Sequence, residues 1–348
     1  LMISLSALWS ETPIATLKWS CVILGTTTVS AYIGKQYQWQ DLYRILCWVG
    51  AGLTILSLVK NTKHGKGWQG ILGHANQLGG AMALISTLWI WQAVNNPKQR
   101  WFSLGIAGAS LLLLQNANSA GAKVQVVVLI SLLIYLKFVK SLSSKWAFLA
   151  VVLFLLLVSI AAILITENLE TIVVDTLGKD MTFTGRRPLW EMLWKQEIKS
   201  HLWLGHGYHS FWQPWRGLDD PGNDVVMPNG WKAPHAHNGF VEILLELGLV
   251  GFVLFILSFF TTLARAVLYF SQSKQPESVL PIILLTFLIL PNLTLSRLLE
   301  VGDVWCYYII SVVRLSLDTR GMTFNDNQRK ESCEPLKSQY ESSPEEDS

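Results

Sequence analysis

Two histidines, His235 and His237, stand directly before a long apolar run. Asn238 follows them and is a residue type that caps helix N-termini, so a helix is expected to begin here. Glu242 and Glu246 then fall four residues apart, on one face of that helix. The helix dipole at this end favours the neutral imidazole that a general base needs. Two other interpretations stay open: the histidines only cap and hydrogen-bond, or they hold a metal ion together with glutamate oxygens.

Two arginines, Arg186 and Arg187, come directly before Pro188, a residue that suits the first turn of a helix. The planar guanidinium group binds phosphate oxygens in pairs, and a helix start also attracts anions. This segment therefore suits a phosphate or pyrophosphate group. The alternative is that the arginines contact lipid head groups or ordinary acidic neighbours.

Polar and basic side chains interrupt the edges of two apolar runs. One junction carries Asn116, Ser119 and Lys123, and another carries His74 and Asn76. Ionisable groups near membrane depth are costly, which makes these residues candidates for substrate binding. Lys123 can instead extend its ammonium group to the membrane surface.

The composition indicates that a membrane protein positions these residues. Of 348 residues, 51% are hydrophobic and 15% are charged, whereas soluble domains are about 25% charged. The 16 tryptophans agree, because tryptophan gathers at membrane–water interfaces. A disordered chain, a coiled coil and a typical soluble enzyme are excluded. The four scattered cysteines show no disulfide or zinc-site spacing, and the basic residues are spread over short loops, so nucleic-acid binding is not expected.

We therefore expect an all-α polytopic membrane protein with about nine transmembrane helices and a long helical periplasmic loop. Each helix needs roughly 20 mainly apolar residues. The candidate spans are residues 17–34, 42–59, 77–94, 101–116, 121–139, 146–166, 247–270, 278–295 and 302–317.

Lysines and arginines in short loops predict the orientation, because cytoplasmic loops carry the excess of positive charge. Basic residues mark the loops 95–100 and 137–145, the segment 265–277 and the tail. With these in the cytoplasm, residues 60–76, 116–121, 167–246 and 296–301 lie outside. The lysines of the 60–76 loop disagree with this rule.

The long segment 167–246 differs in composition from the rest. It holds five of the seven histidines and six of the 16 tryptophans, too many aromatic rings for a disordered loop. Apolar residues recur at spacings of three and four over residues 187–200, which predicts an amphipathic helix. A folded cap on the outer membrane surface is expected.

Four segments result from this division. Residues 1–166 form the first six membrane helices, 167–246 form the periplasmic loop with the active site, and 247–317 form the last three helices. Residues 318–348 carry eight acidic and four basic side chains and are expected to be a disordered cytoplasmic tail.

Several short motifs follow one another along the chain in a defined order. The most specific is His237-Asn238, nine residues, then Gly248 and Gly251. The others are Leu8-Trp9-Ser10, Gly73-His74-Ala75-Asn76, Thr184-Gly185-Arg186 with Trp190, and Leu204-Gly205-His206-Gly207-Tyr208. From about residue 5 to 317 this set resembles the bacterial O-antigen ligase and polysaccharide polymerase superfamily, especially its exopolysaccharide-polymerase-like members. Those proteins usually have about twelve spans, so the resemblance implies that N-terminal spans are missing here.

The resemblance implies glycosyl transfer on the periplasmic side of the bacterial inner membrane. The donor would be a glycan on undecaprenyl diphosphate, and the acceptor hydroxyl would come from lipid A–core or another glycan. His237 would be the general base, and Arg186 would bind the diphosphate leaving group. The reaction would invert the anomeric carbon without a metal, a nucleotide sugar or another cofactor.

Three alternatives remain. A ligase and a polymerase share the donor and differ in the acceptor. A transporter for lipid-linked glycans would more often carry ionisable residues at mid-span. A catalytically inactive scaffold is the third, because the family often has a basic residue directly after the Ser119 junction, whereas this chain has Lys123 one turn later.

Overall fold

The structure, a computed structural model, describes residues 1–60, 63–64, 67–177, 186–225, 230 and 232–319, with backbone alone at 63–64, 162–177 and 186–187. The helices are α1 (Met2–Leu5), α2 (Pro13–Gln36), α3 (Trp39–Lys60), α4 (Ala75–Asn95), α5 (Arg100–Ala117), α6 (Ala120–Val139), α7 (Ser144–Leu177), α8 (Arg186–Met192), α9 (Gly239–Gln272), α10 (Leu280–Asn292) and a last helix over residues 303–319. Short 3-10 helices cover Ser6–Leu8, Pro97–Gln99, Pro214–Asp219, Pro221–Asp224 and Pro276–Val279, and a π-helix covers Leu193–Ile198. The strands β1 (Lys63–His64) and β2 (Gly67–Trp68) form a small antiparallel hairpin.

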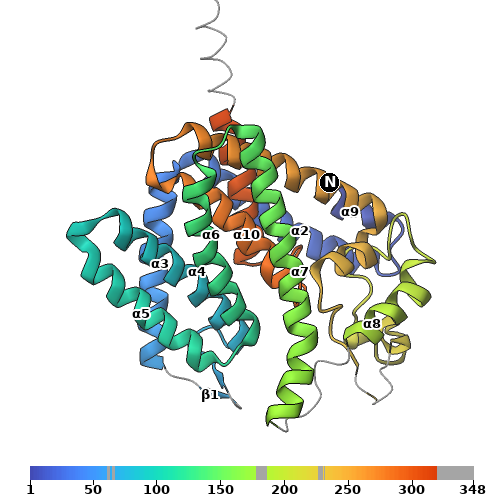
Figure 1. The fold of residues 1–348 in the computed structure, drawn as a ribbon. Helices are drawn as coiled ribbons and strands as arrows, with labels where there is room; N and C mark the ends of the chain where they lie inside the picture. The colour runs from blue at the N-terminus through green and yellow to red at the C-terminus, as the bar shows by residue number, and fades with distance from the viewer. Residues whose placement is uncertain (61–62, 65–66, 178–185, 226–229, 231, 320–348) are drawn as a thin grey trace, which may run out of the picture.

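The long helices run alongside one another as a bundle, and α8 lies to one side of it (Figure 1). The helix α10 packs against α6, α7 and α9, and nearly all of its residues are buried. Small residues bring α4 and α6 close together, since a Cβ on Gly79 would lie 2.7 Å from the Cβ of Ala122. The predicted all-α class is confirmed for the described residues, apart from the two-residue strands.

A helix coincides with each predicted span, although the bounds differ. Among the described residues, four segments are long and apolar enough to cross a membrane: Trp39–Lys60, Ala120–Val139, Ser144–Ala161 and Gly239–Gln272. The count of nine transmembrane helices therefore stays a prediction.

Two helices extend past predicted segment boundaries, and the boundaries stay predictions. The helix expected to end at residue 166 continues to Leu177, because the sequence offers no glycine or proline before Gly178. The last helix includes Asp318, the first residue of the predicted tail, and the carboxylate of Asp318 accepts hydrogen bonds from Arg314 and from Trp39 Nε1 (2.9 Å). Residues 320–348 lie outside the described residues.

Segments that were predicted to lie outside gather at one end of the bundle. A Cβ on Gly67 would lie 2.5 Å from the carbonyl oxygen of Ala117, and a Cβ on Gly121 would lie 3.7 Å from Oγ1 of Thr294. Segments predicted to be cytoplasmic also meet: Lys140 Nζ of the 137–145 loop lies 5.3 Å from the ring centroid of Phe270, and Trp91 Nε1, near the 95–100 loop, donates to the carbonyl oxygen of Pro276 (3.0 Å). This grouping agrees with the predicted alternation, and the side that each end faces remains a prediction.

The predicted amphipathic helix over residues 187–200 is partly correct. The structure has α8 followed by the π-helix Leu193–Ile198, in which the N–H of residue 199 donates to the carbonyl of Trp194 (3.3 Å). In this segment with hydrogen bonds between residues five apart, Leu193 and Ile198 are buried, whereas Trp194 is 45% exposed. Together with the 3-10 turns that follow, these elements form the cap, residues 186–238.

A break in α9 joins the cap to the bundle. Gly248 has φ 63° and ψ −166°, which interrupts the helix. The N–H groups of residues 249–250 donate to the carbonyls of residues 202–203 (2.8 and 3.2 Å), and the N–H groups of residues 206–207 donate to the carbonyls of residues 245–246 (3.0 and 2.8 Å). The backbone groups that the helix gives up are thus satisfied by the cap, as buried polar groups require.

Glycine is required on both sides of this exchange. A Cβ on Gly248 would lie 2.4 Å from the carbonyl carbon of Trp203, and a Cβ on Gly205 (φ 66°) would lie 2.4 Å from that of Glu246. Both residues also have the positive φ that disfavours other side chains. The two glycine motifs noted in the sequence are therefore one structural unit.

Replacing Gly248 by alanine should destabilise the protein by about 2 kcal/mol or more, because the new Cβ adds strain and a backbone clash. Thermal unfolding of the detergent-purified protein measures this. Gly108→Ala is the matched control, since a Cβ at Gly108 in α5 would contact nothing within 4 Å. Equal melting temperatures of the two variants would contradict the account of the break.

Candidate active site

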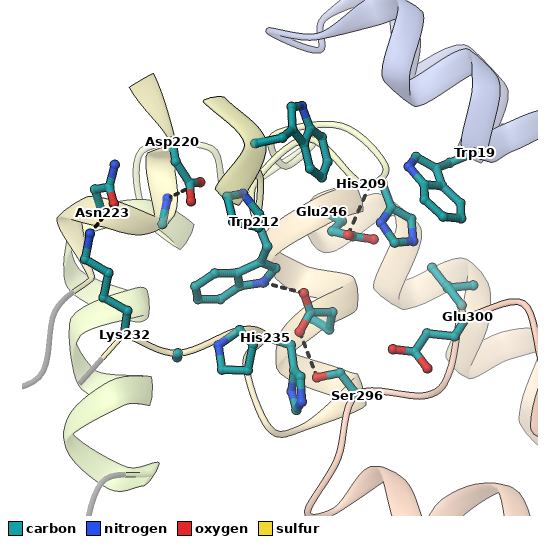
Figure 2. A pocket seen from close by; sticks show the side chains of 18 of the residues that line it. Trp19, His209, Trp212, Asp220, Asn223, Lys232, His235, Glu246, Ser296 and Glu300 are labelled. Carbon is teal, nitrogen blue, oxygen red and sulfur yellow. Dashed lines mark hydrogen bonds between the residues drawn. The ribbon is translucent and has the colours of Figure 1, made fainter. Parts of the chain in front are cut away.

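A cavity of about 800 Å³ lies where the cap meets the bundle (Figure 2). Four parts of the chain line it: α2, the cap, the first turns of α9 and the loop after α10. Its walls combine aromatic rings with carboxylates, namely Trp19, Trp212, Trp215, Asp220, Glu242, Glu246 and Glu300. Flat rings stack on apolar faces of a ligand and carboxylate oxygens accept hydrogen bonds from hydroxyls, so the lining suits a polyhydroxylated ligand such as a sugar.

Glu242 connects three walls of this cavity. Its Oε1 accepts a hydrogen bond from Trp212 Nε1 (2.6 Å), and its Oε2 accepts from the backbone N–H of Ala236 (2.7 Å) and from Ser296 Oγ (2.7 Å). A carboxylate away from water needs such donors. The predicted substrate-binding residue Glu242 therefore has a structural role as well as a place on the cavity wall.

The two predicted histidines are neighbours. Their rings lie 4.0 Å apart between centroids, and the N–H of His237 donates to His235 Nδ1 (3.0 Å). His237 has φ 53°, an uncommon conformation that concentrates at functional sites. His235 lines the cavity, whereas His237 does not, and both ring nitrogens of His237 are shielded from solvent.

Asn238 caps α9 as predicted. Its Oδ1 accepts hydrogen bonds from the N–H groups of Phe240 (2.9 Å) and Val241 (3.3 Å). The side-chain oxygen is thus engaged at the helix start, which fixes the turn that carries His237.

The helix α8 is tied to this same turn. Trp190 Nε1 donates to the carbonyl oxygen of Ala236 (2.8 Å), next to His237 in the chain. Arg186 and Arg187 form the first turn of α8. Their side chains lie outside the described residues, so the structure leaves their predicted roles as proposals.

Sequence reasoning missed His209. Its ring stacks on Trp19 with centroids 4.8 Å apart, its backbone N–H donates to Glu246 Oε1 (3.1 Å), and its φ is 53°. Burial lowers the pKa of His209 from 6.5 to about 4, so the ring is neutral near pH 7. His209 follows the Leu204–Tyr208 motif directly, which was the available signal.

Sequence reasoning also missed Glu300. This residue lies on the wall of the main cavity and of a second one of about 410 Å³ between α3, α4 and the loop after α10. Desolvation by the surrounding protein raises the pKa of Glu300 to about 7; Arg297 opposes this, and the charges of Glu242 and Asp303 add to it. Glu300 reaches the site only because α10 and the loop after α10 fold toward the cavity. The residues next to Glu300 in the sequence therefore gave no local signal.

Three predicted residues lie elsewhere. His74 caps α4, where its Nδ1 accepts from the N–H of Asn76 (3.2 Å), and Lys123 lies half-buried in the first turn of α6. None of the three is among the described residues that line either cavity. Their predicted role in substrate binding has no support from the cavity geometry.

The upstream motif packs on the central one. Trp9 Nε1 donates to the carbonyl oxygen of Leu204 (3.1 Å), and Ser10 Oγ donates to Ser210 Oγ (3.0 Å). Tyr208 hydroxyl in turn donates to the carbonyl oxygen of Leu299 (2.6 Å). Motifs that are about 200 residues apart in the sequence therefore pack against each other, and Tyr208 connects them to Leu299, which lines the cavity.

The contribution of His209 to stability should fall as the pH is lowered from 6.5 to about 4, because the unfolded chain binds a proton at His209 in this interval and the folded chain does not; Glu300, with its raised pKa, acts in the opposite sense. His209→Asn, which tolerates positive φ, should reduce that loss by roughly 2 kcal/mol. Thermal unfolding across this pH range measures it, with His74→Asn at an exposed histidine as control. Parallel pH profiles of wild type and His209→Asn would refute the prediction.

Comparison with known proteins agrees with the predicted resemblance. The family model for O-antigen ligase matches residues 104–256, which contain the cap, His237 and Gly248. The exopolysaccharide production protein ExoQ of Rhizobium meliloti is 26% identical over 291 residues, covering 78% of this chain and 65% of the relative. The chain thus spans about two thirds of the length of that relative. No solved structure matches the chain. The two matches confirm the resemblance, and the chain is a membrane protein similar to the O-antigen ligases and exopolysaccharide-production proteins.

Proposed function

We propose that the protein is a membrane glycosyltransferase that moves a glycan from an undecaprenyl-diphosphate donor to an acceptor hydroxyl. The observation that carries this proposal is the cavity at the end of the bundle, lined by tryptophans and carboxylates and bordered by the His235–His237 turn. It offers stacking surfaces and hydrogen-bond acceptors to sugar rings, next to helices that hold the protein in the bilayer where the lipid part of a donor lies.

His237 is the proposed general base. The acceptor hydroxyl loses its proton to the imidazole while its oxygen attacks the anomeric carbon, and the bond from that carbon to the diphosphate oxygen breaks. Undecaprenyl diphosphate leaves with the electron pair, and the anomeric configuration inverts. Because the ring nitrogens of His237 are shielded here, the turn must open toward the cavity when substrates bind.

Arg186 is proposed to bind the diphosphate and to offset its developing charge, with Arg187 beside it. The support is the position of α8, which begins at Arg186 and whose Trp190 holds the carbonyl of Ala236. Base and leaving-group site then belong to adjacent backbone segments. No metal or cofactor takes part in the proposed step.

The proposed location is the bacterial inner membrane with the cavity on the periplasmic side. The support is that the loops 95–100 and 137–145, predicted to be cytoplasmic from their basic residues, contribute none of the described residues that line the cavity. Donor glycan and acceptor, either lipid A–core or another glycan, would meet in the cavity.

The second candidate is a polysaccharide polymerase that uses the same donor. The similarity to an exopolysaccharide production protein favours it. Deletion of the gene followed by analysis of surface glycans separates the two: loss of glycan from lipid A–core indicates a ligase, and short or missing exopolysaccharide indicates a polymerase.

A transporter for lipid-linked glycans and an inactive scaffold belong to other classes. Both would leave the donor chemically intact. Separation of lipid-linked donor from free undecaprenyl diphosphate after incubation with the purified protein distinguishes them from a transferase.

His237→Asn should lower glycan transfer by about 100-fold or more, the range of general-base contributions, while the protein still folds. Asparagine tolerates the positive φ of this position and so keeps the backbone. Transfer is measured by glycan product formation, with membrane insertion and melting temperature as controls. Wild-type transfer by a correctly inserted variant would eliminate His237 as the base.

Arg186→Lys should lose most of the activity, roughly 10-fold or more, because lysine keeps the charge but not the paired hydrogen bonds to phosphate oxygens. The matched control is Lys199→Arg, at an exposed position of the cap that does not line the cavity. Unchanged initial rates for Arg186→Lys would rule out a bidentate contact with the diphosphate.

A further inference from the structure

Outside the cavity, three side chains of metal-binding type come together in the cap. One ligand atom each from Glu197, His201 and His206 lies within 4.8 Å of the others. His206 is buried, Glu197 is half-buried and His201 is exposed. None of the three is among the residues described as lining the cavity.

The ring of His206 points its Nε2 at this cluster. That atom lies 3.4 Å from Glu197 Oε2, and the side chain is 5% exposed. Within the described ranges Nε2 makes no hydrogen bond, although it is shielded from solvent. A buried ring nitrogen without a hydrogen bond is unfavourable, and coordination to a cation would satisfy it.

The backbone holds the three residues in place. Glu197 lies in the π-helix, a conformation that is rare and frequent at functional sites. The carbonyl of Glu197 accepts from the N–H of His201 (3.2 Å), and the carbonyl of His201 accepts from the N–H of Gly205 (2.9 Å). The N–H of His206 is fixed by the carbonyl of Leu245 on α9.

A hydroxyl supports one of the rings from the side. Ser200 Oγ lies 3.0 Å from His201 Nδ1. A hydrogen bond at one ring nitrogen sets the tautomer and the orientation of a histidine that coordinates through the other, an arrangement common at metal sites.

We propose that Glu197, His201 and His206 bind a divalent transition-metal ion, preferably Zn²⁺. Two imidazoles and one carboxylate are typical zinc ligands, and exposure of His201 leaves room for water as a fourth ligand. The ion would connect the π-helix to the Gly205–Gly207 segment, in which the N–H groups of residues 206 and 207 donate to carbonyls of α9. This proposal does not depend on glycosyl transfer.

The test uses the full chain purified in detergent and dialysed against Zn²⁺ or Co²⁺. Wild-type protein should retain stoichiometric Zn²⁺, show the visible absorption bands of low-symmetry Co²⁺, and unfold roughly 5 °C or more higher at a hundredfold excess of Zn²⁺ over its Kd. If the protein retains no metal and its melting temperature does not change, the cluster is only an ion pair between His206 and Glu197, and the proposal is overturned.

Variants locate the ion. His201→Ala and Glu197→Gln should lose the Co²⁺ bands and most of the thermal shift; His201 is exposed, so its substitution leaves the fold intact. Gln196→Ala, at an exposed neighbouring position, should behave like wild type. Zn²⁺ retained equally by both cluster variants would place the ion elsewhere and refute the assignment.

Discussion

The hydrogen-bond exchange across Gly248 holds the cap to the membrane helices. A helix that breaks loses backbone hydrogen bonds, and at this break the residues 202–207 replace them. The junction also positions His209 and Trp212, which border the cavity and follow it within a few residues in the chain. The same junction places Glu246 so that its carboxylate accepts the N–H of His209.

Glu242 has the corresponding role on the α9 side. It lies one turn into the helix that Asn238 caps, and its three hydrogen bonds join the cap, the histidine turn and the loop after α10. Removal of a carboxylate from water is unfavourable without such donors. Glu242 therefore sets the relative positions of the cavity walls beside the turn that carries His237, the proposed general base.

Local sequence rules predicted what depends on neighbouring residues. The helices and the cap by Asn238 follow from spacing and propensity. The local sequence rules failed for features that depend on tertiary packing. Glu300 and Trp19 reach the cavity from opposite ends of the chain, and the π-helical step from Leu193 to Ile198 depends on packing in the cap. The family resemblance placed the Leu204–Tyr208 motif and the Gly248 motif in one ordered set. The hydrogen bonds between residues 202–207 and 245–250 explain physically why the two motifs occur together.

The central claim is that this site cleaves a lipid-linked donor. The most direct measurement reconstitutes the purified chain in liposomes with a synthetic undecaprenyl-diphosphate glycan and follows undecaprenyl diphosphate and glycan product together. The account predicts that both appear at equal rates and that both require an acceptor hydroxyl. Binding or translocation of the donor with no cleavage, by protein that is folded and correctly inserted, would contradict it.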